Sequence, residues 1–95
     1  MRQVRAAGGL CWKFSSPATS GVPDRVVVLN GRTVFVETKA AGRKLAKLQR
    51  VRLEQIVKAG GEALVLDSRS SVDVFVEKLC ADARTGGMSG GKPSE

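Results

Sequence analysis

The chain has 95 residues, 42% of them hydrophobic, so it has room for one compact domain with a single core. Its formal net charge is +7, and a surface this basic attracts polyanions, among which nucleic acid is the commonest large one. The chain contains no histidine and no tyrosine, which excludes a histidine-based triad, a His-rich zinc site and a tyrosine nucleophile. Any catalysis must therefore come from carboxylates, lysines, hydroxyls, thiols or a bound metal ion.

Two absences predict a cytosolic protein. The longest apolar run, Val26 to Leu29, is far too short for a membrane span, and Met1 to Leu10 lacks the apolar core of a signal peptide. Cys11 and Cys80 are isolated in the sequence, so we expect them to be reduced thiols that serve as small buried apolar residues.

The first elements are short. Residues 1–7 are compatible with a brief helix that Gly8 and Gly9 end, since glycine adopts the left-handed conformation that stops helices. Residues 10–15 alternate weakly and are rich in aromatics, which favours a strand. Two prolines and a glycine in residues 16–23 predict a loop.

A hairpin follows. Two apolar runs, at residues 24–29 and 32–39, are separated by Asn30 and Gly31, the strongest short hairpin signal. We therefore expect two adjacent antiparallel strands.

The second half of the chain predicts a helix, a strand and a further helix. Apolar residues recur at helical spacing between residues 45 and 59, and glycines at 60 and 61 end the pattern before a short apolar strand at 62–66. The sequence from Ser70 to Asp73 is similar to a capping box, which predicts a helix running to about Ala83. Residues 84–95 are rich in glycine and serine and are predicted to be a disordered tail behind a single domain at 1–83.

This order of elements predicts a mixed sheet of about four strands flanked by helices, an α/β or α+β domain. A strand, helix and strand that follow a hairpin require both antiparallel and parallel pairing.

Charged residues stand at the ends of the two hairpin strands. Asp24 opens the first strand, and Glu37 and Lys39 lie on one face near the end of the second. Paired strands are about 4.8 Å apart, so the two carboxylates can converge on a small hard cation such as Mg²⁺. Taken singly, each has a simpler interpretation, because an acid and a lysine in a strand usually form a solvated pair and an aspartate after proline is usually a turn residue. Their joint arrangement favours a metal site.

The same residues carry a resemblance to a known family. The stretch from Gly21 to Gln49 resembles the virus-type replication-repair nuclease domain, VRR-NUC, of the PD-(D/E)xK nuclease superfamily. The matching positions are Gly21, Val22, Pro23, Asp24 and Arg25, then Glu37 and Lys39, then Gln49, with a further likeness at Gly8 to Lys13. The likeness extends from about Gly8 to Leu79.

The resemblance implies a restriction-endonuclease-like core, hydrolysis of DNA phosphodiesters and a bacterial or phage-infected host cell. It implies that Mg²⁺ or Mn²⁺ is held by Asp24, Glu37 and the backbone carbonyl of Thr38, with Lys39 and Gln49 as further catalytic residues. Lys39 is expected to position the attacking water or to stabilise charge that develops on phosphorus. Stand-alone members are linked to symmetric cleavage of branched DNA such as four-way junctions, which implies a twofold homodimer.

The chain departs from the superfamily in one respect. Many members carry a glutamate on the first helix, whereas this chain has no acidic residue before Asp24. Gln3 could stand near the site instead, the helix could be shortened, or another chain of an oligomer could supply the group. Occupancy of a second metal position is therefore an open question.

Gln49 is a polar residue on an otherwise apolar helical face, so it needs a partner. One interpretation is a boundary glutamine at the start of the helix. The other is a hydrogen bond to a ligand of the metal site, to water or to the substrate phosphate.

Basic residues near the proposed site are expected to hold DNA, namely Lys13, Arg25, Arg43, Lys44, Lys47, Arg50 and Arg52. Their phosphate contacts predict binding that depends strongly on salt and little on sequence. For Trp12 and Phe14, core packing is the favoured interpretation and stacking on bases is the alternative.

Two other functions are compatible with the sequence. One is a non-catalytic basic module that binds nucleic acid, and the other is a structural subunit of a ribonucleoprotein, where positive charge serves packing onto RNA. The interpretation we favour is a metal-dependent DNA endonuclease that acts on branched DNA as a homodimer without an organic cofactor or a membrane partner.

Overall fold

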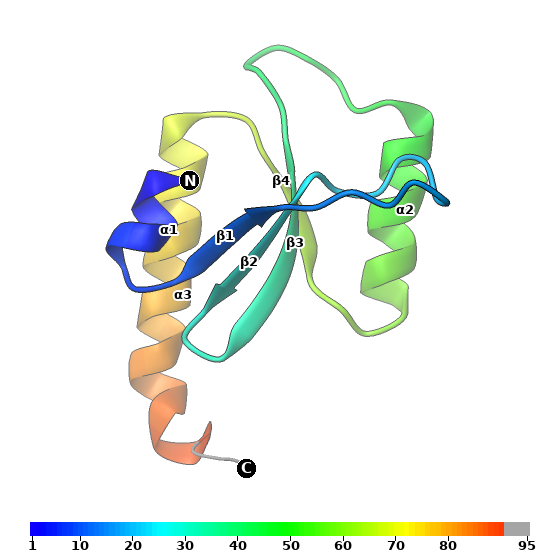
Figure 1. The fold of residues 1–95 in the computed structure, drawn as a ribbon. Helices are drawn as coiled ribbons and strands as arrows, with labels where there is room; N and C mark the ends of the chain where they lie inside the picture. Colours follow the sequence, from blue (N-terminus) through cyan, green and yellow to red (C-terminus); the bar gives the residue numbers. More distant parts are fainter. Residues whose placement is uncertain (91–95) are drawn as a thin grey trace.

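The computed structural model of the protein describes the backbone of residues 1–90 and the side chains of residues 1–81. Four strands form one sheet, with α1 and α3 together on one side of it and α2 on the other (Figure 1). The elements in chain order are α1 (Arg2–Ala6), β1 (Leu10–Lys13), β2 (Arg25–Leu29), β3 (Arg32–Thr38), α2 (Lys47–Lys58), β4 (Ala63–Leu66) and α3 (Arg69–Gly90).

The sheet is mixed, as the order of elements predicts. Its strands lie in the order β1, β2, β3, β4, with antiparallel pairing from β1 to β3 and parallel pairing between β3 and β4. Parallel strands need a crossover connection, and α2 forms the crossover between β3 and β4. The predicted α+β class is confirmed.

The hairpin between β2 and β3 turns at the two residues that the sequence indicates. Asn30 has φ 54° and Gly31 has φ 80°, the pair of positive angles that a two-residue type I′ turn requires. This turn matches the right-handed twist of the strands and sets their register, with Val27 opposite Val34.

One face of the sheet forms the core. Alternate residues of β2 and β3 point to this face, where α1 and α3 cover them. The buried apolar side chains are Val4, Val27, Leu29, Val34, Val36, Leu66, Phe75 and Leu79. Cys11 and Cys80 are free thiols, and both pack against this cluster while remaining partly exposed rather than fully buried.

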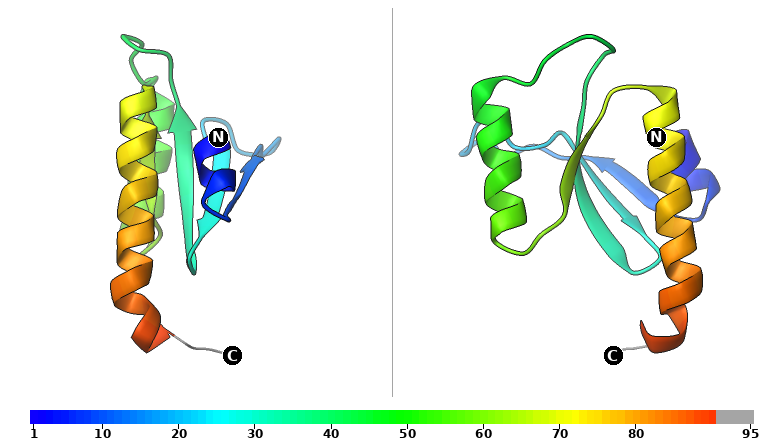
Figure 2. Two further views of the ribbon diagram at one scale, coloured as in Figure 1. Left: turned by 90° about the vertical axis from the view of Figure 1, so that its left-hand side faces the viewer. Right: turned by 180° about the vertical axis from the view of Figure 1, so that it is seen from behind.

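The other face of the sheet is covered only in part. The helix on this side, α2, lies opposite α3 and contacts the edge strand β4 (Figure 2). No residue of α2 is buried, and its apolar residues Leu48 and Val57 are exposed. The helix that the apolar spacing predicts is therefore confirmed. It packs near β4 and leaves most of β1 and β2 uncovered on this face of the sheet.

α3 begins earlier and ends later than the sequence predicts. Ser68 caps the helix by accepting a hydrogen bond from the amide of Ser71 at 3.0 Å, and the Ser71 hydroxyl accepts one from the amide of Ser68 at 3.1 Å. The capping box predicted at Ser70 to Asp73 is therefore wrong by two positions, because Ser68 and Ser71 form the reciprocal pair instead.

The helix continues to Gly90 rather than ending near Ala83. Glycine lowers helix stability without excluding a helix, so the glycines of this stretch are not sufficient to end α3 near Ala83. The predicted tail includes residues 91–95, which lie outside the described part, and the domain boundary at residue 83 stays a prediction. Among the described residues, no helix combines the length and apolar character needed to cross a bilayer.

Candidate functional site

The backbone places Asp24 opposite Glu37. In the β2–β3 pairing Arg25 lies opposite Val36, so the preceding and following residues, Asp24 and Glu37, meet at the next position. Phe14 lies beside Asp24 on the side away from Glu37, because the Phe14 amide donates a hydrogen bond to the Asp24 carbonyl at 2.9 Å. The sheet therefore carries Phe14, Asp24 and Glu37 side by side on adjacent segments.

Glu37 is a buried acid with one unsatisfied oxygen. It is 4% exposed, and its Oε2 accepts a hydrogen bond from Gln49 Nε2 at 3.2 Å, while Lys39 Nζ lies 3.9 Å from the same oxygen. Its Oε1 is buried without a hydrogen-bond partner among the described residues. A buried carboxylate oxygen without a partner is costly, so this position suits a bound cation.

The electrostatics of Glu37 agree with this geometry. Burial raises the pKa of Glu37 above its ordinary value, and the nearby Asp24 carboxylate raises the pKa further. Lys39, the Asp24 backbone amide and Arg25 lower the pKa, but they do not cancel the rise. Two carboxylates that disfavour each other's charge attract a divalent cation more strongly than either acid would alone.

Asp24 is fixed by the end of β3. Its Oδ1 accepts a hydrogen bond from the Thr38 amide at 2.9 Å and its Oδ2 one from the Thr38 hydroxyl at 2.7 Å. The Arg25 guanidinium lies 3.7 Å from Oδ2. Each carboxylate oxygen accepts more than one contact, so Asp24 retains acceptor capacity for a cation.

Gln49 joins α2 to the acid. Its Oε1 accepts a hydrogen bond from the amide of Ala46, the N-cap residue of α2, at 2.9 Å, while its Nε2 donates to Glu37. Gln49 is therefore a boundary residue at the start of the helix whose side chain also holds Glu37, and its contact with a ligand of a metal site stays a prediction. This pair of contacts also fixes the start of α2 beside the end of β3.

Substitution of Gln49 separates these two roles. We expect Gln49→Glu to keep the cap, because its carboxylate still accepts from Ala46, while it repels Glu37 and lowers the DNA cleavage predicted in the sequence analysis by about 10- to 100-fold. Gln49→Ala is expected to lower cleavage similarly and to lose about 1 kcal/mol of stability with the cap. Thermal melts and cleavage rates of both variants test this. Because repulsion from Glu37 also destabilises Gln49→Glu at neutral pH, the melts are compared below pH 4.5, where the carboxyl groups are protonated, and equal melting temperatures there would contradict the capping role.

The donor set fits a divalent cation with few protein ligands. Carboxylate and carbonyl oxygens suit Mg²⁺ or Mn²⁺, and Mg²⁺ commonly keeps several waters when one or two carboxylates bind it. Among the side chains that the structure describes, no three or more acidic, cysteine or histidine residues form a cluster. Gln3 does not stand near the site, because it packs with α3 and donates to Asp73 at 3.4 Å.

The basic residues predicted to hold DNA fall into two groups. Arg25 donates to the Asp24 carbonyl at 3.1 Å, and Arg52 donates to the Ser20 carbonyl at 2.8 Å and to Gln55 at 3.0 Å. These two arginines hold the protein's own loop and acid in place. The others are exposed and carry their charge at the surface, namely Lys13, Arg43, Lys44, Lys47 and Arg50.

Two features of the site are not predicted from the sequence. The Thr38 hydroxyl and amide hold Asp24, whereas the resemblance described above implies a role only for the Thr38 carbonyl. A threonine between two residues of the motif, at the end of a strand, is the signal that could have indicated this. Trp12 is 61% exposed, so the core packing favoured for it is wrong, because no helix covers that part of the sheet.

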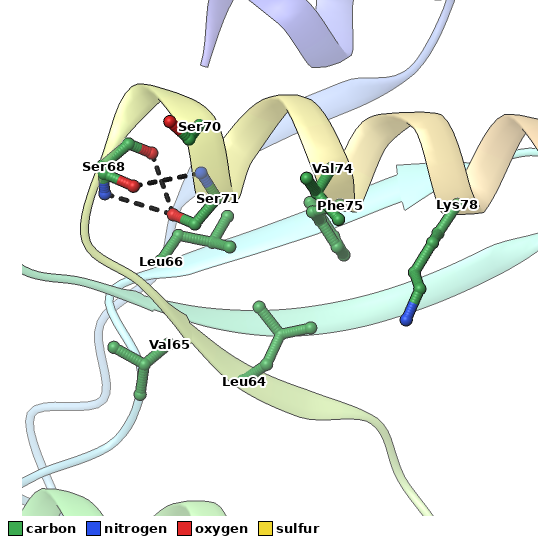
Figure 3. A pocket seen from close by; sticks show the side chains of 9 residues that line it. All are labelled: Leu64, Val65, Leu66, Ser68, Ser70, Ser71, Val74, Phe75 and Lys78. Atoms are coloured by element: carbon green, nitrogen blue, oxygen red, sulfur yellow. Dashed lines mark hydrogen bonds between the residues drawn. The ribbon is translucent and has the colours of Figure 1, made fainter.

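A separate pocket lies on the other side of β4. Its volume is about 470 Å³, and β4 and the first turns of α3 line it, with Leu64, Leu66 and Phe75 as apolar walls (Figure 3). Its serines include Ser68 and Ser71, which are engaged in the cap of α3. None of its lining residues is acidic, so this pocket and the Asp24–Glu37 pair are distinct places on the molecule.

Two known proteins are similar to this chain over most of its length. No protein-family model matches the sequence. The chain is 44% identical over 68 residues to "Putative nuclease p44" of Acyrthosiphon pisum secondary endosymbiont phage 1, a match that covers 70% of this chain and 73% of that protein. A solved structure described as a "VRR_NUC domain" superposes with a TM-score of 0.73 at 35% identity, covering 80% of this chain and 84% of the other. Both similarities extend over more than two thirds of each chain and are not confined to a local motif.

Proposed function

The chain belongs to the VRR-NUC family, and we propose that it is a nuclease that hydrolyses DNA phosphodiester bonds with a divalent cation held by Asp24 and Glu37. The observation that carries this proposal is the buried Glu37 Oε1 that lacks a hydrogen-bond partner beside a second carboxylate. The backbone carbonyl of Thr38 is the proposed third protein ligand. The oxygen-only donor set favours Mg²⁺ or Mn²⁺.

Each residue of the site has a defined task in this proposal. A divalent cation, when bound, supplies Lewis-acid polarisation of the phosphate and lowers the pKa of a coordinated water. Thr38 holds the Asp24 carboxylate through two hydrogen bonds, and Gln49 holds that of Glu37. The Lys39 ammonium, 3.9 Å from Glu37 Oε2, is close enough to donate to a phosphate oxygen at the same place and to stabilise charge that develops there.

The exposed cations in the loop before α2 and in its first turn, together with Lys13 at the end of β1, are the proposed DNA contacts. Lys13, Arg43, Lys44, Lys47 and Arg50 are all exposed, and the chain carries a net charge of +7. Binding through them releases counterions from the phosphates, so affinity is expected to fall steeply as salt rises.

Lys47→Ala tests this surface against a control on the same helix. Lys47 is in the first turn of α2, next to Gln49, whereas Lys58 is in the last turn, about 16 Å along the axis. We expect Lys47→Ala to weaken DNA binding and to reduce the slope of log affinity against log salt by about 1, with no such change for Lys58→Ala. Fluorescence anisotropy at several salt concentrations measures both slopes, and equal slopes would remove Lys47 from the contact surface.

We further propose that the nuclease acts on branched DNA as a homodimer. One chain provides one Asp24–Glu37 pair, and symmetric cleavage of a four-way junction needs two such pairs related by a twofold axis. Light scattering of the protein alone and with a junction measures the assembly. If only monomers are found in both conditions, junction resolution is abandoned while the nuclease proposal stands.

The second candidate function is a basic module that binds nucleic acid without cleaving it. The observation in its favour is that no third acidic side chain in the described part of the chain joins Asp24 and Glu37. Such a module would bind DNA equally well with or without Mg²⁺, and Asp24→Ala would not change its binding.

A substrate panel decides between the two. Labelled four-way junction, flap, single-stranded and linear duplex DNA are incubated with the protein and Mg²⁺, Mn²⁺ or EDTA. We expect cleavage of one or more branched substrates with either cation and none with EDTA. Binding without cleavage of any substrate under all conditions identifies the non-catalytic module.

A further inference from the structure

An apolar strip is exposed on the same sheet face as the acid pair. Alternate residues of β1 and β2 point away from the core here, and Leu10, Trp12, Phe14 and Val28 are 47%, 61%, 37% and 36% exposed. Small domains rarely leave contiguous apolar surface open unless it binds something. The fold places these side chains on the side of the sheet where α2 covers only the far edge.

The strip leads directly to the proposed catalytic residues. Trp12 lies opposite Val26, which lies opposite Phe35, and Glu37 is two residues further along the strand that carries Phe35. Phe14 contacts Phe35 edge to face, with ring centroids 5.4 Å apart, and is the neighbour of Asp24 through its backbone. Strand spacing and rise put Trp12 about 12 Å from Glu37, backbone to backbone.

We propose that Trp12 stacks on a base whose face is exposed at a branch point or in a single strand of the substrate, so that the enzyme selects DNA with exposed bases close to the bond it cuts. This inference rests on the proposed nuclease function. A separation of about 12 Å corresponds to three or four steps of a stacked strand. Bases in an intact duplex present their faces to one another, so an aromatic side chain stacks only on a base whose face is exposed.

The charge of the chain favours nucleic acid over a second copy at this surface. With a net charge of +7, the protein attracts a phosphate backbone, whereas any contact between two copies must overcome repulsion between like net charges. A second copy seated on Trp12 and Phe14 would also stand beside Asp24, on the face that the scissile phosphate must reach. We therefore expect the two copies of the proposed homodimer to contact each other through a different surface.

Tryptophan fluorescence tests the contact directly. Trp12 is the only tryptophan in the chain, which also has no tyrosine, so the emission reports this side chain alone. A single-stranded oligothymidylate is titrated into the wild-type protein with EDTA present, which prevents cleavage. We expect saturable quenching with oligothymidylate and little quenching with an abasic strand of equal length and charge. Equal quenching by both strands, or none by either, overturns the proposal.

Matched variants give a second readout. We expect Trp12→Ala to lose about 5- to 150-fold in affinity for single-stranded DNA, with duplex binding unchanged, and Trp12→Phe to retain most of the affinity. The control is Val74→Ala, which removes a side chain of 53% exposure on α3, on the other side of the sheet. On a substrate with unpaired bases, Trp12→Ala should raise KM and leave kcat unchanged. Wild-type affinity of Trp12→Ala for single strands overturns the proposal.

The outcomes separate this inference from its alternatives. If the tryptophan emission shifts to shorter wavelength as protein concentration rises without DNA, a second copy covers Trp12 and the stacking proposal fails. If oligothymidylate quenches Trp12 but no DNA is cleaved with Mg²⁺ or Mn²⁺, stacking holds and the nuclease proposal fails. If DNA is cleaved without selective quenching, the nuclease proposal holds and stacking fails.

Discussion

Glu37→Ala is expected to lower the rate of DNA cleavage by more than about 100-fold, the upper range for residues that only support metal ligands. The substitution removes the buried oxygen Oε1 and the acceptor of the Gln49 hydrogen bond together. It leaves Asp24 as one acid where the site now has two. Single-turnover cleavage of a labelled branched substrate with saturating Mg²⁺ measures the effect.

The control for this loss is an exposed acid on another element. Glu77 lies on the surface of α3, so Glu77→Ala makes the same chemical change away from the site and should cleave like the wild type. Lys39→Ala is expected to lose about 10²- to 10³-fold, the range for removing one group that stabilises developing charge. Cleavage at wild-type rates by both Glu37→Ala and Lys39→Ala would discard Asp24, Glu37 and Lys39 as the active site.

Glu37→Gln is expected to raise the melting temperature of the metal-free protein at neutral pH by about 4–8 °C, the shift that about 1 kcal/mol produces in a domain of this size. The wild-type carboxylate is buried beside Asp24 with one oxygen unsatisfied. A glutamine keeps the acceptor for Gln49, carries no charge and offers an N–H toward Asp24. Stability and activity should therefore move in opposite directions in this variant.

The pH dependence of this difference follows from the raised pKa of Glu37. Because the folded state holds the Glu37 proton more tightly than the unfolded state, it binds more protons from pH 4.5 up to the raised pKa. The free energy of unfolding of the wild type therefore falls as pH rises through this interval and stays lower above it. Glu37→Gln lacks this loss, so the two proteins should differ at neutral pH and converge below the ordinary pKa.

Melts over a pH series, with Glu77→Gln as the exposed control, test this expectation. Adding Mg²⁺ should stabilise the wild type increasingly as its concentration rises above the dissociation constant of the site and should leave Glu37→Gln nearly unchanged, because a ligand that binds only the folded state raises its stability. A lower melting temperature for Glu37→Gln at neutral pH would show that Glu37 is satisfied in the free protein and would contradict a cation site there.

Local signals predicted the hairpin and the positions of the acids correctly. Asn30 and Gly31 have the positive φ angles that a type I′ turn demands, and this turn sets the register of β2 and β3. Once the register is set, the number of residues from the turn puts Asp24 opposite Glu37. These features depend on neighbours in the chain, so a single sequence contains them.

The helix limits were predicted less well, because several residues compete for each end. Ser68, Ser70 and Ser71 all suit a cap, and the choice between them depends on the direction in which the chain leaves β4 and enters α3.

The burial predicted for Trp12 is wrong for a related reason. An aromatic residue in a strand is buried only if something covers its face, and α2 packs over β4 instead.

Local signals in the chain are enough to predict the mixed α+β class, the hairpin register and the two acids that meet across it. The burial of Glu37, the hydrogen bonds that hold the two acids and the exposure of Trp12 on the same face become known only from the three-dimensional packing. The two groups of features differ in the distance along the chain over which their causes act. Periodicity and turn geometry act between near neighbours, whereas burial and side-chain partners depend on which helix packs on which face of the sheet.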